Sequence, residues 1–371
     1  MIYLDYSATT PVDDRVIESY SLACKKYIGN PNSLHRLGVE AKEVIDASTK
    51  QIADILKVKT SEIIYTSGAS ESNNTAIKGI ALKYANRGKH IISTELEHSS
   101  IIGPLNYLMN NGYEVDFVKL GDNGEIDLDD LKSKLRDDTI LVSISSVNSE
   151  IGIRQPIEKI SKILKDYPKC FFHSDMTQSV GKENIDLSLV DLASFSGQKF
   201  YGMKGVGILY KKEKINIEPL IHGGKSTTIY RSGTPALPLI VSIAKALRLA
   251  YEDFDSKYDK VKKLNTYLRK KLEKVYIDIN SPKDAIPHIL NMSLRGIKSE
   301  TMLHALESED IFISTQTACS VGDYSRAVYA ITHDKERSST SIRVSISYMT
   351  TKDEIDMFVE SLDKKIKELS K

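Results

Sequence analysis

Between residues 15 and 250 the sequence alternates short apolar runs of strand length with longer stretches of helical periodicity. Residues 37–56 place their apolar side chains on one helical face, residues Glu62–Thr66 follow as a strand, and another helix begins near Ser70. Further strand-like runs follow along the chain: His90–Thr94, Val115–Leu120, Ile140–Val147, Cys170–Ser174, Leu192–Ser196 and Gly207–Tyr210. This alternation predicts an α/β fold in which helices cover a mostly parallel sheet.

The character of the sequence changes after Pro238. Two long helical stretches, two strand-like runs and a closing amphipathic helix then follow: Leu239–Phe254, Tyr258–Val275, Ile289–Leu294, Ile311–Ser314 and the residues after Thr351. A chain of 371 residues is also long for a single hydrophobic core. We therefore expect a large domain over residues 15–254 and a small α+β domain from residues 1–14 and 255–371.

The composition argues against several classes of partner. The chain has 51 basic and 50 acidic residues, so its formal charge of +1 does not favour nucleic acid or an anionic membrane as the main partner. No apolar run approaches the roughly 18 to 20 residues that span a bilayer, and Met1–Asp5 show neither the basic nor the apolar region of a signal peptide. Cys24, Cys170 and Cys319 are too scattered for a disulfide framework or a zinc ribbon, so we expect a cytoplasmic protein without a metal site.

Polar residues at the ends of the predicted strands are the candidates for a site, because open α/β sheets bind ligands just beyond the carboxyl ends of their strands. Ser67–Ser72 are mostly small residues that run into a helix, where backbone N–H groups would hold a phosphate or simply form a capped turn. His98 and Asn148 follow two other strands, and each is either functional or a structural residue of its turn. Asp175 follows a very apolar strand and needs a cationic partner, for which a nearby lysine would suffice.

Lys199 follows the run Leu192–Ser196 and lies between small and glycine-rich flanks. Lysine is rarely buried without a function, and a desolvated lysine amine forms Schiff bases readily. Pyridoxal phosphate needs a lysine for its aldehyde, an acid opposite its pyridinium nitrogen and a turn that binds its phosphate. Lys199, Asp175 and Ser67–Ser70 supply these groups together, which predicts an enzyme that uses this cofactor.

Over nearly its whole length the sequence resembles the class V aminotransferases, and among them the cysteine desulfurases of the NifS/IscS type. The matching stretches are Tyr3–Pro11, Gly29–Pro31, Thr66–Asn74, Asn148 with Glu150–Gly152, His173–Gly181, Arg231–Thr234 and Thr317–Ser320. The resemblance implies the type I fold of pyridoxal phosphate-dependent transferases, with a large domain on a mainly parallel seven-stranded sheet and a small α+β domain. It also implies a homodimer whose active sites lie at the subunit interface.

The resemblance further implies a role for each matching residue. Lys199 would form the Schiff base with the cofactor, Asp175 would face the ring nitrogen, and His98 would stack on the ring and move protons. The other implied contacts are Gln178 and Asn148 near the ring oxygen, Ala69, Ser70, Ser196 and Gln198 around the phosphate, Thr234 on the phosphate of the partner subunit, and Arg343 on the substrate carboxylate with Asn148 beside it.

Cys319 matches the loop cysteine that accepts sulfur in this family. The implied reaction converts L-cysteine to L-alanine and leaves a persulfide on Cys319, for transfer to a sulfur-acceptor protein in iron–sulfur cluster assembly or tRNA thiolation. The attacking group must be a thiolate, because a thiol is a poor nucleophile. By itself, a cysteine between Ala318 and Ser320 is typical of a small core residue. Gly322 and Asp323 favour a polar loop instead.

The sequence departs from the family pattern in three places. Gln198 stands where a histidine usually precedes the Schiff-base lysine, and since glutamine carries no charge we expect modestly weaker cofactor binding. Residues 225–227 read Lys-Ser-Thr, where many members have Gly-Gln-Glu or Gly-His-Glu, so either Lys225 supplies local positive charge instead or the dimer contact there differs. Tyr348 replaces the second arginine of a C-terminal pattern whose first arginine is retained as Arg343.

Two alternatives remain compatible with these motifs. A related enzyme acting on another amino acid, such as a selenocysteine lyase or an aminotransferase, would share most of them, although Cys319 favours sulfur transfer. A degenerate homologue would serve as a binding partner or scaffold, although Lys199, Asp175, His98 and Arg343 are all retained.

Overall fold

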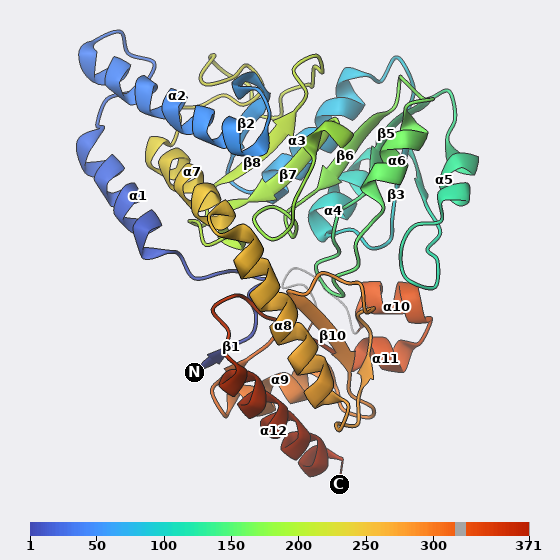
Figure 1. Cartoon of the computed structure of the whole chain (residues 1–371). Helices are drawn as coiled ribbons and strands as arrows, with labels where there is room; N and C mark the ends of the chain where they lie inside the picture. Colours follow the sequence, from blue (N-terminus) through green and yellow to red (C-terminus); the bar gives the residue numbers. More distant parts are fainter. Residues whose placement is uncertain (316–323, 371) are drawn as a thin grey trace.

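The computed structural model describes residues 1–315 and 324–370, and its largest element is a sheet of seven strands (Figure 1). These strands are β2 (Ile63–Thr66), β3 (His90–Ser93), β4 (Glu114–Phe117), β5 (Thr139–Ser143), β6 (Phe171–Asp175), β7 (Leu192–Ser196) and β8 (Gly207–Lys211). Their order across the sheet is β2-β8-β7-β6-β5-β3-β4. Only β8 is antiparallel to its neighbours, so the predicted α/β class and its type I transferase fold are confirmed.

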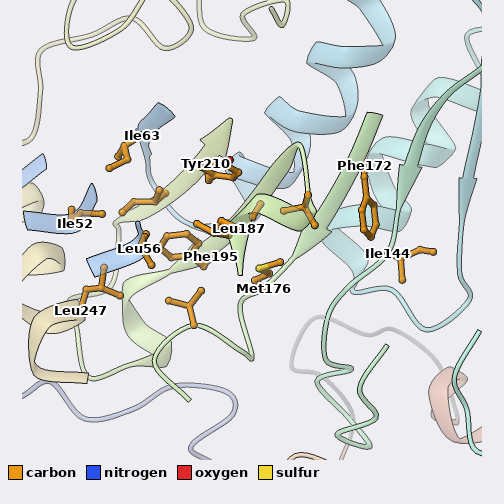
Figure 2. Close-up of a cluster of buried hydrophobic side chains, with 14 of the residues drawn as sticks. Ile52, Leu56, Ile63, Ile144, Phe172, Met176, Leu187, Phe195, Tyr210 and Leu247 are labelled. Carbon is orange, nitrogen blue, oxygen red and sulfur yellow. The ribbon is translucent and has the colours of Figure 1, made fainter. Parts of the chain in front are cut away.

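Helices cover both faces of this large sheet, which is why its central strands are buried on both sides. One face is covered by α3 (Ala69–Lys83) and α4 (Ser99–Met109). The other face packs against α1 (Asp14–Lys26), α2 (Arg36–Leu56), α5 (Leu128–Lys134), α6 (Ile157–Leu164) and α7 (Leu237–Tyr251). Figure 2 shows this second face, where Leu56 and Leu247 of the helices lie near Phe195 of β7.

The remaining strands form two small sheets, in the lower half of Figure 1. Strands β12 (Ser341–Ser345), β10 (Ile289–Ser293) and β9 (Asp278–Ile279) are antiparallel, while β1 (Ile2–Tyr3) pairs in parallel with β11 (Ile311–Phe312). The helices of this half are α8 (Phe254–Leu272), α9 (Ser299–Glu307), α10 (Arg326–Thr332), α11 (Lys335–Ser339) and α12 (Lys352–Leu369). A separate cluster of buried apolar residues joins the small sheets to α8, α9 and α12. Within the described ranges, none of the helices is both long enough and apolar enough to cross a bilayer.

The N-terminal segment connects the two halves. Asp5 pairs with Ser345 beside β12, and Thr10 then hydrogen-bonds through its backbone and side chain to the carbonyl of Gln198 beyond β7. The chain passes back between the halves through α7 and α8, which are separated by Asp253 in a left-handed conformation (φ 53°). The boundary expected at residue 254 stays a prediction.

Most strands predicted from the sequence are present with small shifts of their ends, whereas three strands were not anticipated. The missed strands are β1, β9 and β12. β1 and β9 have two residues each, which is too short to show a periodicity. In β12 the sequence Ser-Ile-Arg-Val-Ser alternates apolar and polar residues, yet all five are buried. Arg343 lines a cavity rather than reaching the solvent.

Candidate active site

A cavity of about 480 Å³ lies where the carboxyl ends of β5, β6 and β7 approach the N-terminal segment and β12. Most of the residues predicted from the sequence line it: Ala69, Ser70, His98, Asn148, Asp175, Gln178, Ser196, Gln198, Lys199 and Arg343. Thr234 is exposed and does not line the cavity of its own chain. Cys319 lies outside the described residues. The fold therefore brings most of the candidate side chains to one place.

One end of the cavity is formed by the turn between β2 and α3. α3 begins at Ala69, so the unpaired N–H groups of its first turn lie beside the cavity. The turn approaches β8 closely, since a Cβ atom on Gly207 would come within 2.6 Å of the Cα atom of Gly68. The backbone N–H of Ser67 donates to Glu71 at 2.7 Å. A glycine at position 207 is thus what lets the turn lie against the sheet.

The charges beside this turn are paired within the chain. Glu71 accepts a hydrogen bond from Arg231 at 3.0 Å. Burial alone would raise the pKa of the Glu71 carboxyl, but the hydrogen bonds from Ser67 and Arg231 outweigh burial and lower it. Ser196 donates its hydroxyl to Oε1 of Gln198 at 3.0 Å, which leaves the amide nitrogen of Gln198 as a donor. The turn therefore offers an anion several neutral donors.

Asp175 is buried at the end of β6 and is held by neutral groups. Its Oδ2 accepts from Asn73 of α3 at 2.7 Å, and its Oδ1 accepts from the backbone N–H of Thr177 at 2.9 Å. Among residues 1–315 and 324–370 no lysine or arginine forms an ion pair with Asp175, so the alternative of a structural salt bridge is wrong. A buried carboxylate without a cation is a site for a positively charged ligand group.

Lys199 reaches the cavity from the turn after β7, and the N-terminal segment lies against it. Its Nζ donates to the carbonyl oxygens of Ser7 at 2.8 Å and of Ala8 at 2.6 Å. Thr10 fixes this contact, because its hydroxyl donates to the carbonyl of Gln198 and accepts from the N–H of Tyr201. A segment 191–192 residues away in sequence thus positions the candidate nucleophile.

His98 is the N-cap of α4, and its protonation state follows from that position. Its Nδ1 accepts from the backbone N–H of Ser100 at 3.1 Å, so the proton of the neutral ring is on Nε2. Burial lowers the pKa of His98, and the positive charges of Lys199 and Arg343 lower it further, against the opposing effect of Asp175. The ring is therefore neutral near pH 7 and has an N–H to donate.

Two amides line the cavity between Asp175 and the N-terminal segment. Gln178 donates from Nε2 to the carbonyl of Ser7 at 3.0 Å and accepts at Oε1 from Lys182 at 2.6 Å. Asn148 donates to the carbonyl of Leu96, and its Oδ1 accepts two backbone N–H groups of its own turn. Asn148 thus has the turn-forming contacts of a structural residue and also lines the cavity.

The far wall of the cavity is formed by Arg343, in the middle of β12. Arg343 is 1% exposed, so it does not form a salt bridge on the surface. Its guanidinium donates to Asp5 at 2.8 Å and to the carbonyl of Ser149 at 3.1 Å. Nε has no partner among the described residues, although it is fully buried. A guanidinium at the wall of a cavity is suited to a carboxylate.

Comparisons with known proteins agree with this architecture. Residues 2–358 match the family model described as aminotransferase class-V. The chain belongs to the class V aminotransferase family. It is 42% identical to a protein described as a NifS/IcsS homolog from Lactobacillus delbrueckii, over all of this chain and 98% of the relative. It is also 42% identical to a cysteine desulfurase IscS from Klebsiella pneumoniae, over 98% of this chain and 92% of the relative.

A solved structure described as a NifS-like protein superimposes on this class V aminotransferase with a TM-score of 0.94, at 34% identity and over 99% of both chains. This agreement extends to the small half of the fold. The membership in the family and the pyridoxal phosphate-dependent transferase class are thereby established, and the predicted resemblance is confirmed.

Sequence reasoning missed several residues that build the site of this class V aminotransferase. Asn73, Asp5 and Lys182 each contact a candidate residue, and the carbonyls of Ser7 and Ala8 contact Lys199. Asn73 had a detectable signal, since it lies among apolar residues on the buried face of α3. Asp5 and the carbonyls of Ser7 and Ala8 had none, because their partners lie far away in the sequence, and Lys182 is four residues from Gln178 in a turn without periodicity.

Proposed function

We propose that the cavity binds pyridoxal phosphate. The observation that carries the proposal is the convergence of Lys199 and Asp175 on one cavity that also contains the start of α3. Lys199 supplies an amine for the aldehyde, Asp175 supplies a carboxylate without an ionic partner for the ring nitrogen, and the turn at Ser67–Ser70 supplies donors for the phosphate. The residues present therefore fit this group.

The chain's own residues then perform the binding and proton transfers around the substrate. Bound pyridoxal phosphate supplies an electron sink for bonds at the α-carbon of an amino acid. Lys199 Nζ takes the α-proton. His98 lines the cavity and carries a proton on Nε2, which it can donate during the reaction. Arg343 lines the cavity and receives the α-carboxylate, while its bond to Asp5 holds the guanidinium in place.

The proposed substrate is L-cysteine, and the chain acts as a cysteine desulfurase. Curated relatives over nearly the full length carry that name, which disfavours another amino acid as the main substrate. The thiolate of Cys319 attacks the substrate sulfur, a sulfur–sulfur bond forms, and the bond from Cβ to sulfur breaks with its electron pair passing to carbon. The carbon takes up the proton lost by the thiol, so a persulfide and L-alanine result without an added oxidant.

The proposed setting of the enzyme rests on the family resemblance. We propose a cytoplasmic homodimer in which the exposed Thr234 reaches the phosphate in the partner subunit. The persulfide would then pass to an acceptor protein, for iron–sulfur cluster assembly or tRNA thiolation.

The decisive experiment measures sulfide and alanine from purified protein loaded with pyridoxal phosphate, with L-cysteine, L-selenocysteine and other amino acids compared. We expect turnover of L-cysteine and a visible Schiff-base absorbance, both lost in Lys199→Ala. Lys162→Ala is the matched control, since Lys162 is an exposed lysine of α6. Colourless wild-type protein after incubation with the cofactor would disprove the proposal.

The role of Cys319 is tested separately. Cys319→Ala should keep the cofactor absorbance and lose persulfide formation. Cys24→Ala is the control, because Cys24 is an exposed free cysteine, while burial raises the pKa of the Cys170 thiol and keeps it unreactive. Normal sulfide release by Cys319→Ala would remove this residue from the mechanism.

A further inference from the structure

Lys182 is a buried lysine that the proposed reaction does not use. It lies in the turn after β6, it is 8% exposed, and its Nζ donates to Oε1 of Gln178 at 2.6 Å. Among the described residues it forms no ion pair, so an ammonium is buried against a neutral amide. A buried cation without a counter-ion is costly, and cores rarely retain one by chance. Within the described part of the chain, Lys211 is also buried without an ion pair but lies away from the site, whereas Lys182 lines a chamber together with Lys199, and this location points to a role in the site.

A chain of hydrogen bonds connects Lys182 to Lys199. Lys182 donates to Gln178, Gln178 donates at 3.0 Å to the carbonyl of Ser7, and Lys199 donates at 2.8 Å to the same carbonyl. The two ammonium groups thus lie on either side of one amide and one carbonyl oxygen. No described carboxylate pairs with Lys182: the neighbouring Glu183 is paired with Arg154.

The two lysines also share a second, smaller chamber of about 30 Å³, which both of them line. A volume of this size holds about two water molecules. The other titratable groups facing it are Tyr6, Tyr201, Lys257, Tyr258, His288 and Tyr348. None of them is a carboxylate, so nothing in this lining neutralises the charge of Lys182.

The position of Lys182 is fixed by the backbone of its turn. Gly181, just before it, has φ +74°, and a Cβ atom there would meet the Cβ atom of Phe200 at 2.8 Å. The tight turn leaves little freedom to withdraw the lysine from the site. Burial lowers the pKa of Lys182 to about 7, and repulsion from Lys199 and Arg343 adds to this effect.

We propose that Lys182 is a positioning residue for Lys199: while Lys182 carries its proton, its charge, held in place through Gln178, favours the neutral, nucleophilic amine of Lys199. Lys182 carries this proton at and below neutral pH. Electrostatic coupling is reciprocal, so the repulsion that Lys182 experiences from Lys199 acts equally on Lys199. The arrangement resembles other sites in which an adjacent cation activates a lysine amine. This inference deepens the proposed function, because it concerns the amine that would receive the cofactor.

The test measures the amine of Lys199 directly in the full-length protein after removal of cofactor. Brief acetylation with acetic anhydride across a pH series, followed by mass spectrometry, reports the fraction of neutral amine at each lysine. In Lys182→Met and Lys182→Gln the labelling midpoint of Lys199 should move to higher pH by about one unit, which is about tenfold less labelling below the midpoint. Glutamine retains a donor for Gln178 and removes only the charge.

Lys211→Met is the matched control, since Lys211 is a buried lysine of β8 that lines neither chamber. In Lys211→Met, the pH midpoint for labelling of Lys199 should equal that of the wild type. An unchanged midpoint in folded Lys182→Met and Lys182→Gln would overturn the proposal. If both variants fail to fold, the wild type still decides: labelling of Lys182 itself with a midpoint no lower than that of exposed Lys162 would also overturn it.

The loaded enzyme provides a second readout. The pH midpoint of the Schiff-base absorbance should move upward in both Lys182 variants and stay unchanged in Lys211→Met. A wild-type protein that binds no cofactor would disprove the proposed function, yet the acetylation series would still decide the role of Lys182. The two failures are therefore distinguishable.

Discussion

The two walls of the cavity are built in different ways. On the large-sheet side, Asp175 and Lys199 come directly after parallel strands, where the fold itself gathers polar residues. On the opposite side, Arg343 lies in the middle of β12, an antiparallel strand whose five residues are all buried. The comparison teaches that the first wall follows from the topology, whereas the second depends on how the small sheet packs against the cavity.

The walls also differ in how their charges are compensated. Asp175 is held by neutral donors from Asn73 and Thr177, so its charge is left for a ligand. Arg343 already has an anionic partner in Asp5, and a substrate carboxylate must share the guanidinium with it. The large-sheet wall should thus govern cofactor chemistry, and the β12 wall should govern substrate affinity.

The largest effect is expected at the large-sheet wall, in Asp175→Asn. Loss of the charge removes the partner of the ring nitrogen, so kcat/KM for L-cysteine should fall by on the order of a thousandfold. Steady-state sulfide release measures this, with Asp116→Asn on β4 as the control. A rate within a few-fold of the wild type would show that Asp175 does not face the ring.

At the β12 wall, Arg343→Ala should act on affinity. Charged hydrogen bonds contribute about 1.5–3 kcal/mol each, so KM for L-cysteine should rise by roughly 10- to 100-fold while the cofactor absorbance is retained. Arg295→Ala, which removes an exposed arginine paired with Asp278, is the matched control. An unchanged KM would place the carboxylate elsewhere, with Arg231 and Arg326 as the next candidates.

The interior of the large sheet should carry a pH dependence of stability. The His173 ring is buried and hydrogen-bonds to Ser143 and Ser194. Burial lowers the pKa of His173 to about 4. The unfolded chain therefore binds more protons between about pH 6.5 and pH 4, and stability falls as the pH drops through this window. Denaturant unfolding at pH 7 and pH 5 should show a loss of stability that is smaller by about 1–2 kcal/mol in His173→Gln than in the wild type. Equal losses in both proteins would contradict this assignment.

The smallest effect is expected for Asp5→Asn, which sharpens the contrast between the walls. Asparagine retains an acceptor for Arg343 but removes the competing charge, so the substrate carboxylate becomes its main anion. KM for L-cysteine should fall by about threefold, the scale of a partly solvated ion pair. A rise in KM instead would mean that the negative charge of Asp5 is needed to hold the guanidinium in place and does not compete with the substrate.

Much of the fold could be predicted because buried parallel strands and amphipathic helices have local patterns. The end of each strand then indicated Asp175, Lys199 and the turn at Ser67–Ser70 without any knowledge of contacts. The strand β12 escaped prediction because its central arginine breaks the apolar pattern. The partner Asp5 escaped because a hydrogen bond between residues so distant in sequence leaves no periodic signal, and Lys182 escaped because it lies in a turn.

The amino-acid sequence by itself determined the α/β class, the family and the polar residues at the strand ends, since each depends on local order along the chain. Only the tertiary structure decided which groups compensate which charges: that Asp175 has neutral partners, that Arg343 shares its charge with Asp5, and that Lys182 lies behind Lys199. The physical reason is that burial and electrostatic interaction depend on distance in space, and the contacts involved join residues up to 338 positions apart.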